Sequence, residues 1–394
     1  MPATQPDGKR FYRPELDALR FFAFFAVFIH HALQALGVTE VIKSQGPLLH
    51  SVQQIAAVVE QAGNFGMSLF FVLSAYLITE LLLIEVDRTG KVRIKDFYIR
   101  RILRIWPLYF FFLAVCVALN FIYPHHFAIT GGRVAAFLLL AGNWYLVNHA
   151  FAPAEMSVLW SISIEEQFYL VWPGIVRLGR GRRGVAIASA FFFLLSIGTL
   201  LYLGKPGILC LPVWFNSFVQ FLFFAVGAQI ALHTQRRQLN RPAWLRALLI
   251  LGGVALWLAS AGATHIMLQP GGDLLYRGQL LAGYGLAAAG TCLLFLGVLG
   301  IRASFVPQWL RYLGKISYGL YVFHMMTLLP SVWVLTAIAR GLHFHGALLI
   351  ATKLAVPLLS LGSTIAVSAL SYRFLESPFL RLRKRFTVVA SRPV

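Results

Sequence analysis

Three residues in the first hydrophobic run of the chain have side chains that could do acid–base or anion-binding chemistry, namely Asp17, Arg20 and His31. On a helix that turns about 100° per residue, Arg20 and His31 lie about 20° apart and Asp17 lies about 40° from His31, so all three share one face. The rise from Arg20 to His31 is about 16 Å, roughly half the hydrocarbon thickness of a bilayer. If this run crosses a membrane with Arg20 at one surface, His31 lies near the midplane and is a candidate general base.

The composition of the chain indicates that a membrane surrounds this run. Hydrophobic residues make up 59% of the 394 residues, charged residues make up 12%, and the mean hydropathy is +0.73. Such a chain cannot cover a water-facing surface, so we predict an all-α polytopic membrane protein. The formal net charge of +20 does not indicate nucleic acid, because the Lys and Arg residues cluster between apolar runs, where they set the topology.

The three cysteines, Cys116, Cys210 and Cys292, are odd in number and lack the spacing of metal ligands. We therefore expect neither a disulfide framework nor a metal site. The first apolar run is long and carries polar residues without a small-residue cleavage site, so it is expected to remain as the first span.

Eleven apolar runs follow one another along the chain, and the charges between them decide which runs cross. If run 134–150 crossed, the loop 177–184 with its four arginines would lie outside, against the positive-inside rule. With that run at the outer interface, ten spans remain, both termini are cytoplasmic, and 28 of the 34 Lys and Arg residues lie inside. We expect one transmembrane domain, 1–394, with cytoplasmic ends at about 1–15 and 373–394. The spanning runs lie near 16–37, 64–86, 105–123, 158–176, 185–203, 214–233, 246–267, 280–300, 316–336 and 349–372.

A cluster of arginines precedes the third span, in the stretch FYIRRILRIWPLYF. Arg100, Arg101 and Arg104 lie within about a turn and a half of helix, and Arg101 and Arg104 share a face. The cluster is either a positive-inside anchor beside interfacial aromatic residues or a phosphate-binding site, since guanidinium groups suit anionic oxygens. The residues alone favour neither interpretation.

The densest polar site lies in LWSISIEEQFYLVWP, residues 159–173. Ser161, Glu165 and Tyr169 recur every four residues and so line one helix face, while Glu166 points about 100° away. The stretch could be a capped helix start, with Ser before acidic residues. The surrounding aromatic residues favour a depth at which a carboxylate needs a histidine or arginine partner, so we expect one of the two glutamates to be functional.

Late in the chain, KISYGLYVFHM places Ser317, Tyr321 and His324 on one face. A buried histidine of this kind can simply bond a neighbouring helix, and the same packing role is expected of His30. Ser74, in the second span, is expected to bond carbonyl groups of its own helix.

Six motifs in order resemble the acyltransferase family 3 of bacterial membrane proteins. They are LDALR with Arg20 followed by ten residues and His31, FFVLSAYLI, RRILRIWPLY, WSISIEEQFYLVWP, ISYGLYVFH and the closing ESP. The resemblance implies an O-acyltransferase of the bacterial cytoplasmic membrane that moves an acyl group, commonly acetyl, from cytoplasmic acyl-CoA to a hydroxyl of a surface polysaccharide, a lipid-linked glycan or a glycosylated small molecule. Acyl-CoA would be a co-substrate, and no permanently bound cofactor is implied.

The resemblance also implies roles for individual residues. His31 matches the essential histidine of the family and Arg20 its paired arginine. Arg101 and Arg104 match the arginine pair of the family and would bind acyl-CoA. Ser161, Glu165 and Tyr169 match its serine-glutamate-tyrosine face. Independently of the resemblance, we expect Asp17, Glu166 and His324 to support these residues.

Together these observations lead to a mechanistic hypothesis. The three arginines Arg20, Arg101 and Arg104 would hold the phosphates of CoA while its arm presents the thioester near midplane. Neutral His31 would take the proton of the acceptor hydroxyl, directly or with Glu165 orienting the imidazole. The competing class is a proton-coupled transporter or flippase of a glycan or lipid, which would use the same groups as a relay and leave the thioester intact.

Overall fold

The long apolar runs of the sequence form helices because a segment in a bilayer has to satisfy its backbone hydrogen bonds internally. The computed structural model describes residues 12–37, 47–123, 129–149, 154–205, 210–235, 237, 239–264, 266 and 276–387. Within these ranges the chain is helical and contains no strand, so the predicted all-α class is confirmed.

Nine helical segments of the described chain are long and apolar enough to cross a membrane. Six are single helices: α1 (Pro14–Ala35), α5 (Ile94–Ile122), α11 (Arg182–Leu203), α13 (Ser217–Thr234), α14 (Ala243–Thr264) and α15 (Arg277–Val298). A seventh is α17 (Ser317–Gly341). The other two join α3 (Pro47–Gly63) to α4 (Gly66–Thr89), and α18 (Gly346–Ser371) to η3 (Tyr372–Glu376), α19 (Ser377–Leu382) and η4 (Arg383–Phe386).

The tenth predicted span is α10 (Trp160–Leu178), which differs from the nine others in charge. Its 19 residues include Glu165, Glu166 and Arg177. A helix of that length is about 28 Å long, close to the thickness of the hydrocarbon layer. The prediction of about ten spans therefore agrees with nine apolar segments plus one polar helix that carries candidate site residues.

The predicted run at 134–150 forms short helices instead of a span. It contains most of α7 (Gly131–Leu138) and all of α8 (Gly142–Asn148), which have eight and seven residues. Neither can cross a bilayer, which takes about 20 helical residues, so the prediction that this run does not span is confirmed. The other short elements are α9 (Ala154–Ser157), α12 (Cys210–Trp214), η2 (Ala303–Phe305) and α16 (Gln308–Lys315).

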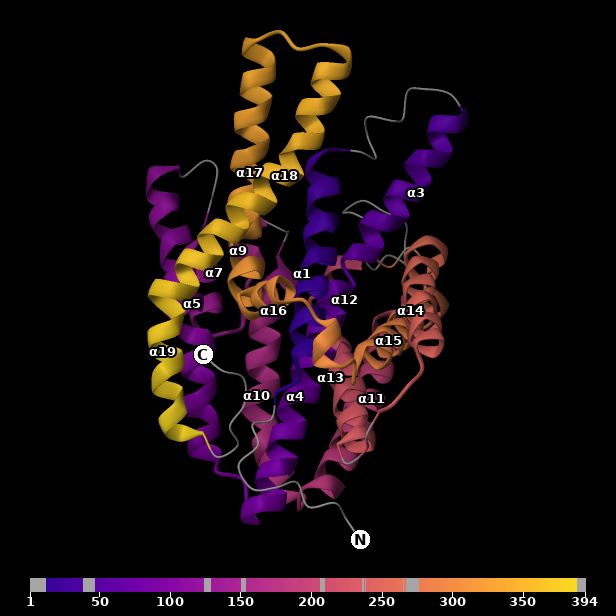
Figure 1. The fold of residues 1–394 in the computed structure, drawn as a ribbon, viewed down its shortest axis with the longest axis vertical. Coiled ribbons are helices and arrows are strands. Elements are labelled where there is room, and N and C mark those ends of the chain that lie inside the picture. Colours follow the sequence, from indigo (N-terminus) through magenta and orange to yellow (C-terminus); the bar gives the residue numbers. More distant parts are fainter. Residues whose placement is uncertain are drawn as a thin grey trace.

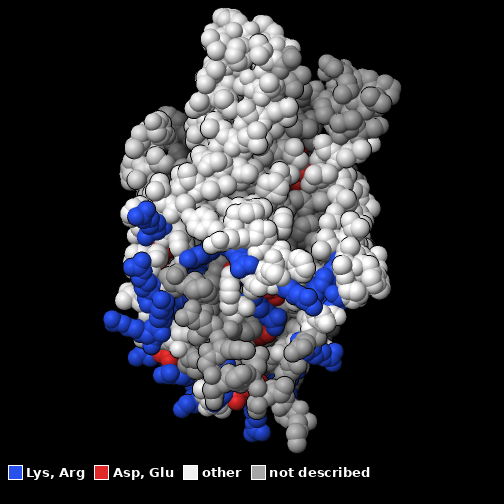
Figure 2. Space-filling view, in the orientation of Figure 1, with Lys and Arg blue, Asp and Glu red and all other residues white. Residues whose placement is uncertain are grey.

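Charged side chains are unevenly distributed between the two ends of the bundle. In Figure 1, α17 and α18 rise together as a hairpin at the top, and α4, α10 and α11 reach toward the bottom. In the same orientation, Lys and Arg side chains gather over the lower half, while the part around the hairpin carries almost none (Figure 2). By the positive-inside rule, this distribution predicts that the lower end faces the cytoplasm.

Helix α1 is held closely by its neighbours, which fixes the position of its polar residues. It packs against α3, α4, α16 and α17. A Cβ atom added at Gly66 would overlap the backbone carbonyl of Ala23, and one added at Gly314 would overlap the carbonyl of Asp17. Both neighbouring helices therefore touch the backbone of α1, and the start of this helix cannot shift without displacing α16.

Candidate active site

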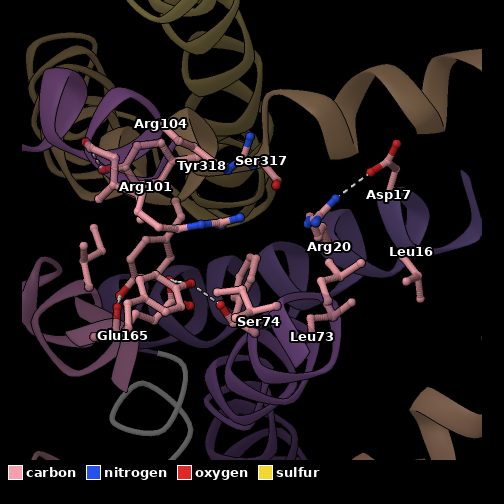
Figure 3. Close-up of a pocket in the computed structure, with 18 of the residues that line it drawn as sticks. Leu16, Asp17, Arg20, Leu73, Ser74, Arg101, Arg104, Glu165, Ser317 and Tyr318 are labelled. Atoms are coloured by element: carbon pink, nitrogen blue, oxygen red, sulfur yellow. Dashed lines mark hydrogen bonds and ion pairs between the residues drawn. The ribbon is translucent and has the colours of Figure 1, made fainter. Parts of the chain in front are cut away.

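A cavity of about 180 Å³ lies between α1, α4, α5, α10 and α17 (Figure 3). Its polar lining comprises Tyr12, Arg13, Asp17, Arg20, Ser74, Arg101, Arg104, Ser161, Glu165, Tyr169, Ser317, Tyr318, Tyr321 and Arg383. Five of these residues are arginines and two are acids, so the cavity carries a positive excess when all are ionised. A site of this kind attracts anions.

Arg20 enters the cavity from α1, opposite Arg101 and Arg104 of α5 (Figure 3). Its Nη1 atom donates to the Oδ1 atom of Asp17 at 2.6 Å, and the hydroxyl of Tyr12 donates to the other oxygen of that carboxylate at 2.9 Å. Asp17 is thus held from two sides and in turn orients Arg20. These contacts suit Asp17 to positioning the arginine.

The guanidinium group of Arg101 lies over two aromatic rings. Its Cζ atom is 5.6 Å from the ring centroid of Phe97 and 5.6 Å from that of Tyr169. Its buried Nε atom has no hydrogen-bond partner among the described residues. Stacking fixes the plane of the group and leaves donors for a ligand, which is the arrangement that suits arginine to phosphate recognition.

Arg100, the third member of the arginine cluster, has a structural role. It donates to Oε2 of the buried Glu85 at 3.2 Å and to the backbone carbonyl of Phe386 at 2.8 Å. It does not line the cavity. The cluster is therefore divided: Arg100 is paired within the protein, whereas Arg101 and Arg104 line the cavity.

The three residues spaced by four on α10 all face the cavity. The hydroxyl of Tyr169 donates to Oε2 of Glu165 at 3.0 Å and is also hydrogen-bonded to Ser74. Ser161 donates to the hydroxyl of Tyr321 at 2.9 Å. The α10 face therefore connects α4 on one side to α17 on the other.

Glu166 lies outside this cavity, and its partner differs from the predicted one. Its Oε2 atom accepts a hydrogen bond from the indole nitrogen of Trp106 at 3.1 Å, not from a histidine or arginine. The prediction of a histidine or arginine partner is wrong for this residue, because the 100° offset from Glu165 turns it toward the aromatic residues of α5.

His31 does not line the cavity, although it lies on the helix that carries Arg20. Its ring lies 5.2 Å from that of His324 and 4.7 Å from that of His30, measured between centroids. Its Nδ1 atom is 3.4 Å from Oε1 of Gln34. The face shared with Arg20 was inferred from angle alone, whereas the rise of about 16 Å carries His31 beyond the cavity wall.

Glu165 is not the partner that orients His31 in this structure. Its carboxylate is held by Tyr169 of its own helix, and the hydrogen-bond partner of His31 is Gln34. His30 is buried and bonds the backbone carbonyl of Glu60 through Nδ1 at 2.7 Å, in agreement with a packing role.

Several lining residues were not identified from sequence. Ser74 was expected to bond its own helix, but its hydroxyl contacts Tyr169 on the cavity wall. Tyr12 precedes the first helix and carries no helical pattern to mark it. Tyr318 donates to the carbonyl of Ile105 at 2.9 Å and closes the wall between α17 and α5. The position of Ser74 within one of the six motifs was the available signal.

Residues 13–373 match the family model described as an acyltransferase domain. The chain belongs to this acyltransferase family. The match covers nearly the whole chain and confirms the resemblance seen in the motifs. No solved structure matches the chain.

Two relatives show how this acyltransferase family member compares with curated proteins. It is 27% identical to the peptidoglycan O-acetyltransferase OatA of Listeria monocytogenes over 396 residues, which cover 94% of this chain and 56% of the relative. It is 31% identical to the O-acetyltransferase OatA of Staphylococcus aureus over 172 residues, which cover 42% of this chain and 25% of the relative. The chain spans about half the length, or less, of these relatives.

Proposed function

We propose that this protein is an O-acyltransferase of the bacterial cytoplasmic membrane that moves an acyl group, with acetyl as the first candidate, from cytoplasmic acyl-CoA to a hydroxyl of a sugar-containing acceptor. The observation that carries the proposal is the cavity in which arginines of α1 and α5 converge beside the hydroxyl and carboxyl groups of α10. CoA is a polyanion with a narrow, uncharged arm. An arginine-rich cavity with aromatic and aliphatic walls suits both parts of such a molecule.

The arginines would bind the phosphates of the donor. Arg101 is held in plane by two aromatic rings and Arg20 by Asp17, so little side-chain freedom is lost when a phosphate binds. The basic end of the bundle is the end predicted to face the cytoplasm, where acyl-CoA is made. Both features support donor entry from that side.

The chemistry proposed is transfer of an acyl group to oxygen. His31 removes the proton of the acceptor hydroxyl, the oxygen attacks the carbonyl carbon of the thioester, and the carbon–sulfur bond breaks. The proton then passes to the thiolate of CoA. His31 is half-buried in α1, and a neutral imidazole is the form that a general base requires.

The name of one relative supports a class of acceptor. One is named a peptidoglycan O-acetyltransferase, and peptidoglycan is a polymer of sugars. We therefore propose a hydroxyl on a carbohydrate-containing acceptor, in a surface polysaccharide, a lipid-linked glycan or a glycosylated small molecule. Such an acceptor would approach from the side of the membrane opposite the basic end.

Acyl-CoA consumption tests the proposal directly. The purified chain in nanodiscs is mixed with acetyl-CoA labelled in the acetyl group and with a soluble glycan fragment, and both free thiol and labelled glycan are measured. We expect thiol release and acetylated glycan to rise together. A transporter would leave the thioester intact, so an unchanged acetyl-CoA pool with each of several glycan classes would contradict the proposal.

A further inference from the structure

His324 on α17 is a buried histidine that lies next to the candidate base. Its side chain is 0% exposed, and its Nδ1 atom lies 2.5 Å from the backbone carbonyl oxygen of Tyr321. Because a carbonyl can only accept a hydrogen bond, Nδ1 carries the hydrogen in the neutral ring. The Nε2 atom therefore carries the lone pair.

This lone pair has no partner in the described part of the chain. Among the residues that the structure describes, none forms a hydrogen bond with Nε2 of His324, although the atom is buried. Buried polar atoms without partners are uncommon, and each calls for a physical reason. A lone pair held in a dry site is available to accept a proton that arrives during a reaction.

The surroundings of His324 point to the direction from which that proton would arrive. Its ring lies 5.2 Å from the ring of His31, 5.6 Å from that of Tyr321 and 6.2 Å from that of Phe24. Two imidazole rings joined by an N–H···N bond of about 2.9 Å have centroids about 5 Å apart. The distance of 5.2 Å between the rings of His31 and His324 is therefore compatible with such a bond.

An imidazolium would be costly at this place without such a partner. The ring of His31 contacts the rings of His30 and His324, and its Nδ1 atom contacts the amide of Gln34; among the described residues no carboxylate is bonded to it. His30 cannot accept through Nδ1, because that atom faces the carbonyl of Glu60. His324 is the neighbour with a free acceptor atom.

We propose that His324 is a positioning residue that shares the proton taken up by His31, an inference that rests on the proposed acyl transfer. The O–H bond of the acceptor breaks and its proton is held between Nε2 of His324 and a ring nitrogen of His31. The acceptor oxygen forms the new bond to the acyl carbon, and the bond from that carbon to sulfur breaks. The pair then returns the proton to the thiolate of CoA, so that both rings end neutral.

Substitution by the two amide side chains tests this role. His324→Asn keeps an N–H group for the Tyr321 carbonyl but has no atom at the position of Nε2. His324→Gln can place an amide oxygen near that position. We expect kcat to fall roughly 10- to 100-fold in the Asn variant, with an unchanged KM for acyl-CoA, and to recover in part in the Gln variant.

A control variant separates this effect from damage to the helix pair. Thr327→Val, one turn along α17, removes the hydrogen bond to Thr364 of α18, 2.6 Å long, without touching His31. We expect its kcat to stay within about threefold of the wild type.

The double variant gives the decisive comparison. If His324 acts through His31, adding His324→Asn to His31→Ala lowers the residual rate no further. A further loss of rate in the double variant, or a wild-type kcat in His324→Asn, would overturn the inference. The proposed function would still stand in that case, provided that the wild-type chain is active. A wild-type chain that consumes no acyl-CoA would overturn both.

Discussion

Replacing His31 by alanine is expected to lower the turnover of acyl transfer by about 10²- to 10⁴-fold, the usual share of a general base. The reason is chemical: the variant removes the imidazole nitrogen that takes the hydroxyl proton, and the basic rings that flank this position in the described part of the chain are those of His30 and His324. The variant is compared with the wild type in nanodiscs by the release of free CoA thiol, at matched protein amounts and with acceptor present.

His30→Ala is the matched control because it removes an adjacent imidazole. His30 is buried and bonds the backbone carbonyl of Glu60, so its loss is expected to lower the free energy of unfolding by about 1 kcal/mol and to change kcat only a few-fold. Near wild-type turnover in His31→Ala, with normal membrane levels, would contradict the assignment. Glu165 and His324 would then be the next candidate bases.

Arg101→Ala and Arg104→Ala are each expected to weaken acyl-CoA binding by about 1 to 3 kcal/mol, or roughly 5- to 150-fold in Kd. Both side chains line the cavity, and each loss removes charge-assisted hydrogen bonds to a phosphate. Binding of a non-hydrolysable acyl-CoA analogue to the protein in nanodiscs measures the effect. The loss should grow smaller as salt is added, since screening weakens the wild-type contacts.

Arg100→Ala provides the control for this pair, since it removes an adjacent arginine that faces away from the cavity. Its guanidinium group pairs with the buried Glu85, so we expect reduced stability with an unchanged Kd. If all three variants bind the acyl-CoA analogue with the wild-type Kd, Arg101 and Arg104 act only as positive-inside anchors.

Hydropathy and charge predicted most of the fold correctly. The spans, the short helices in the 134–150 run and the all-helical class follow from two simple constraints, the apolar solvent and the sidedness of Lys and Arg. The run 158–176 was counted among the spans as well, and it forms α10, whose glutamates and Arg177 set it apart from the nine apolar segments.

Helical periodicity predicted which residues share a face, but not how far along the helix a cavity extends. Ser161, Glu165 and Tyr169 are within two turns of one another, so a shared face placed them at one cavity. Arg20 and His31 are three turns apart, and the same argument overestimated their proximity. The angular position of a residue follows from its own helix. How far the cavity extends along the helix axis depends on which neighbouring helices close it.

The sequence patterns did not predict contacts between distant segments. Nothing in the spacing of Arg100 and Arg101 shows that one bonds Glu85 and Phe386 while the other stacks on Tyr169. Likewise, the ring contact between His31 and His324 joins residues on the first and one of the last helices. Such pairings are set by tertiary packing, which single-helix patterns do not contain.

Photo-crosslinking with a diazirine-bearing acyl-CoA tests most directly whether the arginine-lined cavity is the donor site. We expect labelled peptides from α1, α4, α5 and α17, protected by excess acetyl-CoA and weakly labelled in Arg101→Ala. The structure offers an alternative location, an apolar groove of about 610 Å³ between α11, α13 and α15. Labelling of that groove, or labelling of the cavity helices that excess acetyl-CoA does not reduce, would contradict the account.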